Sequence, residues 1–76
     1  MTNNINTLNN IKSGKNVKVM GIQGGRNVRN RLMEMGVVEG VSIYVVTNNG
    51  GPLIISIDNS RFAMGRGVAQ KITVNS

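Results

Sequence analysis

The segment that decides the fold is residues 24–36, with the sequence GGRNVRNRLMEMG. It is the one stretch whose apolar residues recur with a helical period, since at about 100° per residue Val28, Leu32 and Met35 share one narrow stripe. A helix this short is marginally stable in water, because nucleation is costly and few hydrogen bonds follow it. The sequence therefore predicts one short α-helix that buries this stripe against a structure made of strands and turns.

The residues at each end of this helix indicate where it begins and ends. The glycine pair at 24–25 leaves the chain free to turn into the helix. Gly25, Arg26 or Asn27 is the expected N-cap, and Asn27 is the best of the three by residue type. Gly36 suits the left-handed position that follows a helix. Val37, just beyond it, is placed to contact Leu32 as in a Schellman ending.

Short segments with alternating polar and apolar residues, or with many β-branched residues, are typical of strands. In residues 16–20, for example, the alternation turns Val17 and Val19 inward and Lys18 toward water. The predicted strands are 16–20, 41–47, 53–58, 61–64 and 70–74. In the later strands, the residues expected to face the core are Leu53, Ile55, Ile57, Ile72 and Val74. These elements predict a mainly β fold, a small SH3-like, partly open β-barrel, because that architecture closes most sheet edges at minimal length.

A chain of 76 residues is long enough for a single domain with a small core, which no disulfide reinforces because cysteine is absent. We predict that residues 1–6 form a disordered tail and that residues 7–76 form the domain. Leu8 and Ile11 are its first buried anchors. No stretch approaches the roughly 18 apolar residues of a membrane span, so we expect a cytoplasmic protein.

The residue types that carry most catalysis and metal binding are missing or sparse. The chain has no histidine and no cysteine, which removes the usual general base, the commonest metal ligand and the thiol nucleophile. Its three carboxylates are scattered, and its five methionines have no repeated spacing. The glycines at 21–25 precede a helix, but the lysine and the Ser or Thr of a P-loop are missing. We therefore predict no catalytic residue, no cofactor and no metal site.

The charge balance indicates the kind of partner. Nine Lys and Arg against three Asp and Glu give a net charge of +6, which favours an acidic partner, a nucleic acid or an anionic membrane surface. Only Tyr44 and Phe62 are aromatic, so we do not expect a stacking platform for single-stranded nucleic acid. Contact with the phosphate backbone alone stays open. A small basic β-barrel that binds nucleic acid is therefore the alternative to a protein-binding module.

The chain contains, in this order, the segments 7–14, 21–22, 24–25, 31–37 and 61–74. Their order and spacing resemble the ferrous iron transport protein A (FeoA) family, from Leu8 to Val74. The resemblance implies an SH3-like barrel and a cytosolic accessory role beside the ferrous-iron transporter FeoB, whose cytosolic part carries a GTPase domain. Iron is then the cargo of the pathway and not a ligand of this chain. The protein would meet the membrane only through this partner.

The predicted helix also presents side chains outside its buried stripe, and these are candidates for contact with the partner. The predicted interaction residues are Arg29, Arg31 and Met33 on the helix rim, with Arg61 and Arg66 as outside candidates. The residues predicted to be structural are Val28, Leu32, Met35 and Gly36. For Arg31 the alternative is a pair with Glu34 at i+3, and for Met33 it is a plain exposed apolar side chain.

Overall fold

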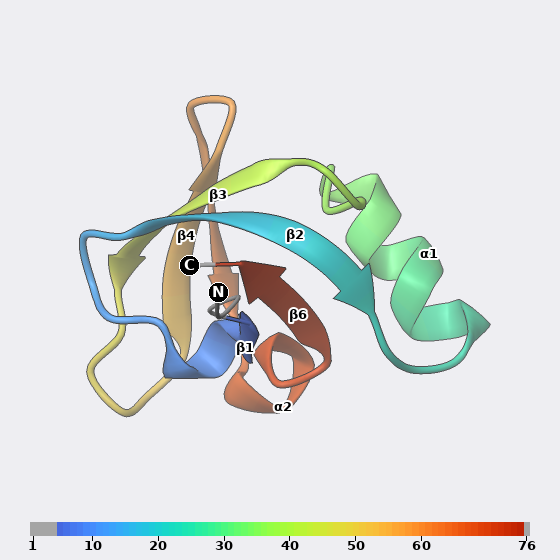
Figure 1. The fold of residues 1–76 in the computed structure, drawn as a ribbon, viewed down its shortest axis with the longest axis horizontal. Helices are drawn as coiled ribbons and strands as arrows, with labels where there is room; N and C mark the ends of the chain where they lie inside the picture. The colour runs from blue at the N-terminus through green and yellow to red at the C-terminus, as the bar shows by residue number, and fades with distance from the viewer. Residues whose placement is uncertain (1–4, 76) are drawn as a thin grey trace.

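The computed structural model describes residues 5–75, and in that part of the chain six antiparallel strands form one curved sheet (Figure 1). The strands are β1 (Ile5–Thr7), β2 (Asn16–Ile22), β3 (Ser42–Thr47), β4 (Leu53–Ile57), β5 (Ser60–Met64) and β6 (Ile72–Asn75). The helices are a 3-10 turn, η1 (Leu8–Asn10), then α1 (Arg26–Glu34) and α2 (Arg66–Ala69). The strand order is β1-β6-β2-β3-β4-β5, so β2 to β5 form a meander and β6 returns to pair with β2. The predicted mainly β fold is confirmed.

Every strand predicted from residue alternation is present, with ends shifted by one or two residues. Irregular pairing in β2, between Val19 and Gly21, and in β3, between Val45 and Thr47, marks bulges that bend the sheet. The side chains predicted to face inward are buried, and they are Leu8, Ile11, Val17, Val19, Leu53, Ile55, Ile57, Ile72 and Val74. Lys18 is exposed, as its place in the alternation requires.

The β4–β5 hairpin turns between Ile57 and Ser60. Asp58 and Asn59 have φ angles of 50° and 69°, both in the left-handed region. Two-residue hairpin loops of this kind match the twist of the strands, and Asn and Asp tolerate the conformation better than most residues. The tight turn aligns Ile57 with Ser60 and so sets the register of the whole hairpin.

The amino-terminal boundary differs from the predicted one. Residues 1–4 of the predicted tail lie outside the described residues. Ile5 and Asn6, which were expected to belong to the tail, lie in β1 and pair with Asn75 and Val74 of β6. The reason is that a strand ladder is held by main-chain hydrogen bonds, which a polar sequence forms as well as an apolar one.

The N-cap of α1 is Gly25, one of the three predicted candidates, and the preference for Asn27 by residue type was wrong. Gly24 has a φ angle of +125°, which suits glycine, and it lets the chain turn sharply before the helix. The amide of Gln23 donates a hydrogen bond of 2.7 Å to the carbonyl of Lys71, next to β6. This contact with a distant segment fixes the turn, and Asn27 already lies inside the helix.

The end of α1 is the predicted Schellman motif. Gly36 has a φ angle of +89°. Its amide donates to the carbonyl of Met33 over 2.9 Å, and the amide of Val37 donates to the carbonyl of Leu32 over 2.8 Å. Leu32 and Val37 are both buried, so the apolar contact that accompanies this motif joins the core.

The expectation of a single helix was wrong, because residues 65–69 also turn into a helix. Gly65 is the N-cap of α2, and the amide of Ala69 donates to the carbonyl of Gly65 over 3.0 Å. Ala69 is buried, and Val68 packs against the core. One helical turn is too short to show a period in the sequence.

Candidate protein-interaction site

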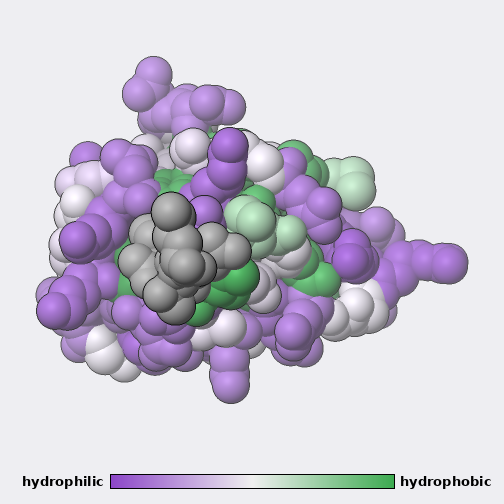
Figure 2. Space-filling model, viewed as in Figure 1, coloured by the Kyte–Doolittle hydropathy of each residue, from purple (hydrophilic) through white to green (hydrophobic). Residues whose placement is uncertain are grey.

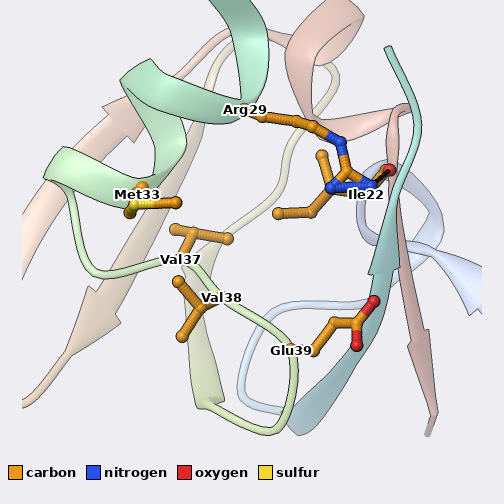
Figure 3. Close-up of a pocket in the computed structure, with 6 residues that line it drawn as sticks. All are labelled: Ile22, Arg29, Met33, Val37, Val38 and Glu39. Carbon is orange, nitrogen blue, oxygen red and sulfur yellow. Dashed lines mark hydrogen bonds between the residues drawn. The ribbon is translucent and has the colours of Figure 1, made fainter. Parts of the chain in front are cut away.

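An open cleft lies between α1, the end of β2 and the segment that follows α1. Its volume is about 400 Å³. The residues that line it are Ile22, Arg29, Met33, Val37, Val38 and Glu39 (Figure 3). We call this site the α1 cleft.

The apolar wall of the α1 cleft follows from the way the helix ends. The Schellman turn at Gly36 places Val37 in the core, with its side chain at the base of the cleft. Val38, the next residue, lines the same cleft and stays 42% exposed. Met33, on the last turn of α1, is 60% exposed, more than any other large apolar side chain that the structure describes. Figure 2 shows hydrophobic residues reaching the surface beside α1 on an otherwise mainly hydrophilic face.

Arg29 spans the cleft from the helix to the sheet. Its Nη2 donates a hydrogen bond of 3.1 Å to the main-chain carbonyl of Ile22, the last residue of β2 (Figure 3). Arg29 and Met33 are four residues apart, so they lie on the same face of α1. The guanidinium thus adds a positive charge to a wall that is otherwise apolar.

Glu39 is the negative group of the cleft, and Figure 3 shows its carboxylate well apart from the Arg29 guanidinium. The loop that carries it is tied to β2, because the amide of Gly40 donates to the carbonyl of Val19 over 2.8 Å. A Cβ on Gly21 would lie 4.0 Å from Oε1 of Glu39, so the carboxylate passes close to the main chain of β2.

The structure does not bring all five predicted interaction residues together. Arg29 and Met33 share the α1 cleft, whereas Arg31 lies on the other flank of the helix. There it lines a smaller cleft of about 200 Å³ together with Asn27, Val28, Leu32 and Val68. Arg61 is exposed on β5, near the tip of the β4–β5 hairpin, and lines neither cleft.

Arg66 is occupied by contacts within the domain. Its guanidinium donates to Oδ1 of Asn48 over 2.6 Å, to the carbonyl of Asn9 over 2.8 Å and to the carbonyl of Gly51 over 3.2 Å. Nδ2 of Asn48 in turn donates to the carbonyls of Asn9 and Ile11 over 3.1 and 2.6 Å. The side chain therefore holds α2, η1 and the β3–β4 loop together.

The predicted structural residues of α1 lie where packing needs them. Leu32 is 1% exposed, and Val28 and Met35 are partly buried against the core. Gly36 is exposed, and its role comes from the left-handed main chain described above.

Sequence reasoning missed Ile22, Val38 and Glu39 as lining residues of the cleft. Ile22 had been counted with the glycine-rich turn, and Glu39 with the turn before β3. The available signal was the pair Val37-Val38 directly after the helix stop, because an extended chain turns consecutive side chains to opposite sides. One valine of such a pair must then be exposed beside the helix.

The chemistry available at this site is that of binding. Within residues 5–75 the structure brings together no group of three or more His, Cys, Asp or Glu side chains that could hold a metal ion. The apolar wall can bury an aliphatic or aromatic side chain, and Arg29 can pair with a carboxylate. None of the helices in this part of the chain is long and apolar enough to cross a membrane.

The fold and the cleft define the class as a small SH3-like β-barrel. A solved structure of the same class is the FeoA of Stenotrophomonas maltophilia, crystallised with zinc and described as a prokaryotic SH3 domain protein. It is 27% identical, covers 90% of this chain and 87% of its own, and has a TM-score of 0.80. The chain belongs to the FeoA domain family, whose model matches residues 6–76.

Two further comparisons agree with this family. The Fe(2+) transport protein A of Methanocaldococcus jannaschii is 43% identical over 63 residues, which are 83% of this chain and 77% of the relative. The crystal structure of a FeoA described as an iron uptake regulatory protein is 36% identical and has a TM-score of 0.90. That match covers 93% of this chain and 96% of the other. A manganese-dependent transcriptional repressor is similar at 20% identity, which is a likeness of fold alone. The resemblance inferred from the sequence is confirmed, and the family is associated with ferrous-iron transport.

Proposed function

We propose that this protein is a cytosolic accessory protein of ferrous-iron uptake that binds the cytosolic, GTPase-bearing region of a FeoB-type membrane transporter through the α1 cleft. Family membership supports the link to ferrous-iron transport. The observation that carries the choice of surface is the exposure of Met33 and Val38 side by side in one cleft.

Leaving the apolar side chains of this surface in water has a free-energy cost. Burying apolar area is favourable by about 25 cal/mol per Å², and contact energy in interfaces concentrates where an apolar side chain fills a pocket. Among residues 5–75, three other large apolar side chains are exposed by 40% or more, but Ile5, Met20 and Tyr44 lie on β1, β2 and β3 and line neither cleft. The α1 cleft is therefore the best docking surface.

The proposed role is binding without catalysis. The whole sequence lacks histidine and cysteine, and its three acids lie on α1, in the loop before β3 and in the β4–β5 turn. A role as partner of the transporter needs only a complementary surface, and the iron passes through the transporter without a ligand from this chain.

The test is a titration of the ¹⁵N-labelled protein with the purified cytosolic region of the transporter. We expect the amides of Ile22, Arg29, Met33 and the segment 37–39 to shift. Met33→Ser should weaken the affinity by about tenfold, because an apolar anchor is lost from the interface. Met20→Ser is the matched control, since Met20 is 46% exposed but lies outside the cleft. No shift anywhere, or shifts confined to the β4–β5 tip, would contradict the proposal.

Binding to nucleic acid remains the second candidate, favoured by the net charge of +6 alone. The nine cationic side chains are distributed over the η1–β2 connection, β2, α1, β5, α2 and the turn before β6, so no single element carries them. Binding of mixed oligonucleotides should fall steeply between 50 and 200 mM salt if phosphate contacts drive it. The absence of a complex at 50 mM salt would rule this candidate out.

A further inference from the structure

The two charged side chains of the α1 cleft lie apart from each other along its β2 side, and the apolar wall faces them both (Figure 3). In Figure 3, the Arg29 guanidinium lies beside Ile22, the Glu39 carboxylate lies apart from it, and the two valines and Met33 lie to one side of the line between them. The cleft therefore has a positive and a negative side.

On the positive side of the cleft, the Arg29 guanidinium can donate hydrogen bonds to a partner. A guanidinium has five N–H donors in a planar fork. Within residues 5–75 Arg29 uses Nη2 for the carbonyl of Ile22, and this bond holds the side chain in place over the cleft. Its remaining donors fit a carboxylate, and a charge-assisted bond of this kind is stronger than a neutral one.

The negative side has the opposite preference. The Glu39 carboxylate accepts hydrogen bonds only and is exposed to solvent. It attracts an ammonium, a guanidinium or an amide N–H, and it repels carboxylate and phosphate groups. A phosphate backbone laid along this cleft would meet Glu39 unfavourably, and a second copy of this chain would bring a further charge of +6.

We propose that the α1 cleft takes a segment of the partner protein that presents an acidic and a basic side chain to the two charged groups of the cleft and an apolar side chain to the wall that faces them. The acidic side chain pairs with Arg29, the apolar side chain packs against Met33 and Val38, and the basic side chain lies at Glu39. The opposed charges set the direction in which the segment lies, since the reversed direction would place like charges together. This inference rests on the proposed function, in which the α1 cleft is the docking surface.

The test inverts the two charges. The double variant R29E/E39R leaves the net charge at +6 and every apolar lining residue unchanged. We expect it to bind the transporter's cytosolic region at least about tenfold more weakly than the wild type, because both charges then face like charges. The matched control is R31E/E34R, an inversion on the same helix outside the α1 cleft, which should bind within about twofold of the wild type.

The substitution of Arg29 also removes its hydrogen bond to Ile22, so two further variants change Glu39 alone. Glu39→Gln and Glu39→Arg leave Arg29 intact, and we expect a graded loss of affinity from the first to the second. Thermal unfolding and amide spectra check that each variant is folded.

The outcomes separate this inference from the proposed function. If the wild type does not bind the cytosolic region, both are wrong. If Met33→Ser weakens binding but R29E/E39R and the Glu39 variants bind like the wild type, the cleft is the docking surface and the directional inference is overturned. Equal losses in R29E/E39R and R31E/E34R would also overturn it, because the general charge of the helix would then account for the effect.

Discussion

Arg66 donates a hydrogen bond of 2.6 Å from Nη1 to Oδ1 of Asn48, and this pair is the centre of a polar network that joins three segments. The network reaches main-chain carbonyls of Asn9 and Ile11, which lie 39 and 37 residues from Asn48. It supplies hydrogen-bond donors to the main-chain carbonyl of Asn9, inside η1, and to that of Ile11, directly after η1. These polar contacts therefore stabilise the packing of α2 and η1 against the β3–β4 loop.

Asn48→Ala should destabilise the protein by about 1–3 kcal/mol, because two carbonyls and a guanidinium lose a partner in a partly buried site. Urea unfolding followed by circular dichroism measures the change. The neighbouring Asn49 is exposed, and Asn49→Ala should change the free energy of unfolding by less than about 0.5 kcal/mol. Equal effects of the two substitutions would show that the network contributes nothing.

Arg66→Lys should lower stability by about 1–2 kcal/mol, since an ammonium cannot reproduce the fork that reaches Asn48, Asn9 and Gly51. Affinity for the transporter's cytosolic region should stay unchanged, because the charge is kept and the side chain lies outside the α1 cleft. Denaturant unfolding and calorimetric titration measure the two quantities. Arg61→Lys is the control for stability, and a loss of affinity in Arg66→Lys at unchanged stability would refute this assignment.

Gly36→Ala should cost about 1–2 kcal/mol of stability, because the residue has a φ angle of +89°. Space is not the reason, since an added Cβ would lie 3.8 Å from Cγ2 of Ile57, an ordinary contact. Gly67→Ala in α2 is the opposite case. Its Cβ would meet nothing within 4 Å, and alanine is a better helix former, so we expect a gain of about 0.5–1 kcal/mol. Melting temperatures of the two variants should move in opposite directions.

Leu32→Ala and Met33→Ala should separate folding from recognition at adjacent positions. Leu32 is 1% exposed, and its truncation should cost about 2–5 kcal/mol. Met33 is 60% exposed, so Met33→Ala should change stability by less than about 0.5 kcal/mol while weakening partner binding. Chemical unfolding and partner titration of both variants check this pair of outcomes. A Met33 variant as unstable as the Leu32 variant would place Met33 in the core.

The strands could be predicted because their signal is local. Alternation in residues such as Val17, Lys18 and Val19 reports which side of a strand is buried, whatever strand lies next to it. The end of α1 was predictable for a similar reason, since the left-handed conformation of Gly36 is a property of a few consecutive residues. The N-cap could be narrowed only to three residues, because the contact of Gln23 with Lys71 decides where α1 begins.

The sequence by itself determined the mainly β barrel, its buried residues, the stop of α1 and the membership of the FeoA family, since these depend on local patterns and on their order along the chain. Only the tertiary structure decided which exposed side chains act together. It placed Arg29 and Met33 beside Val38 and Glu39, moved Arg31 to the other flank of the helix, and tied Arg66 to Asn48. The physical reason is that a cleft is formed by segments that meet in space, and the periodicity of one segment does not record which others it meets.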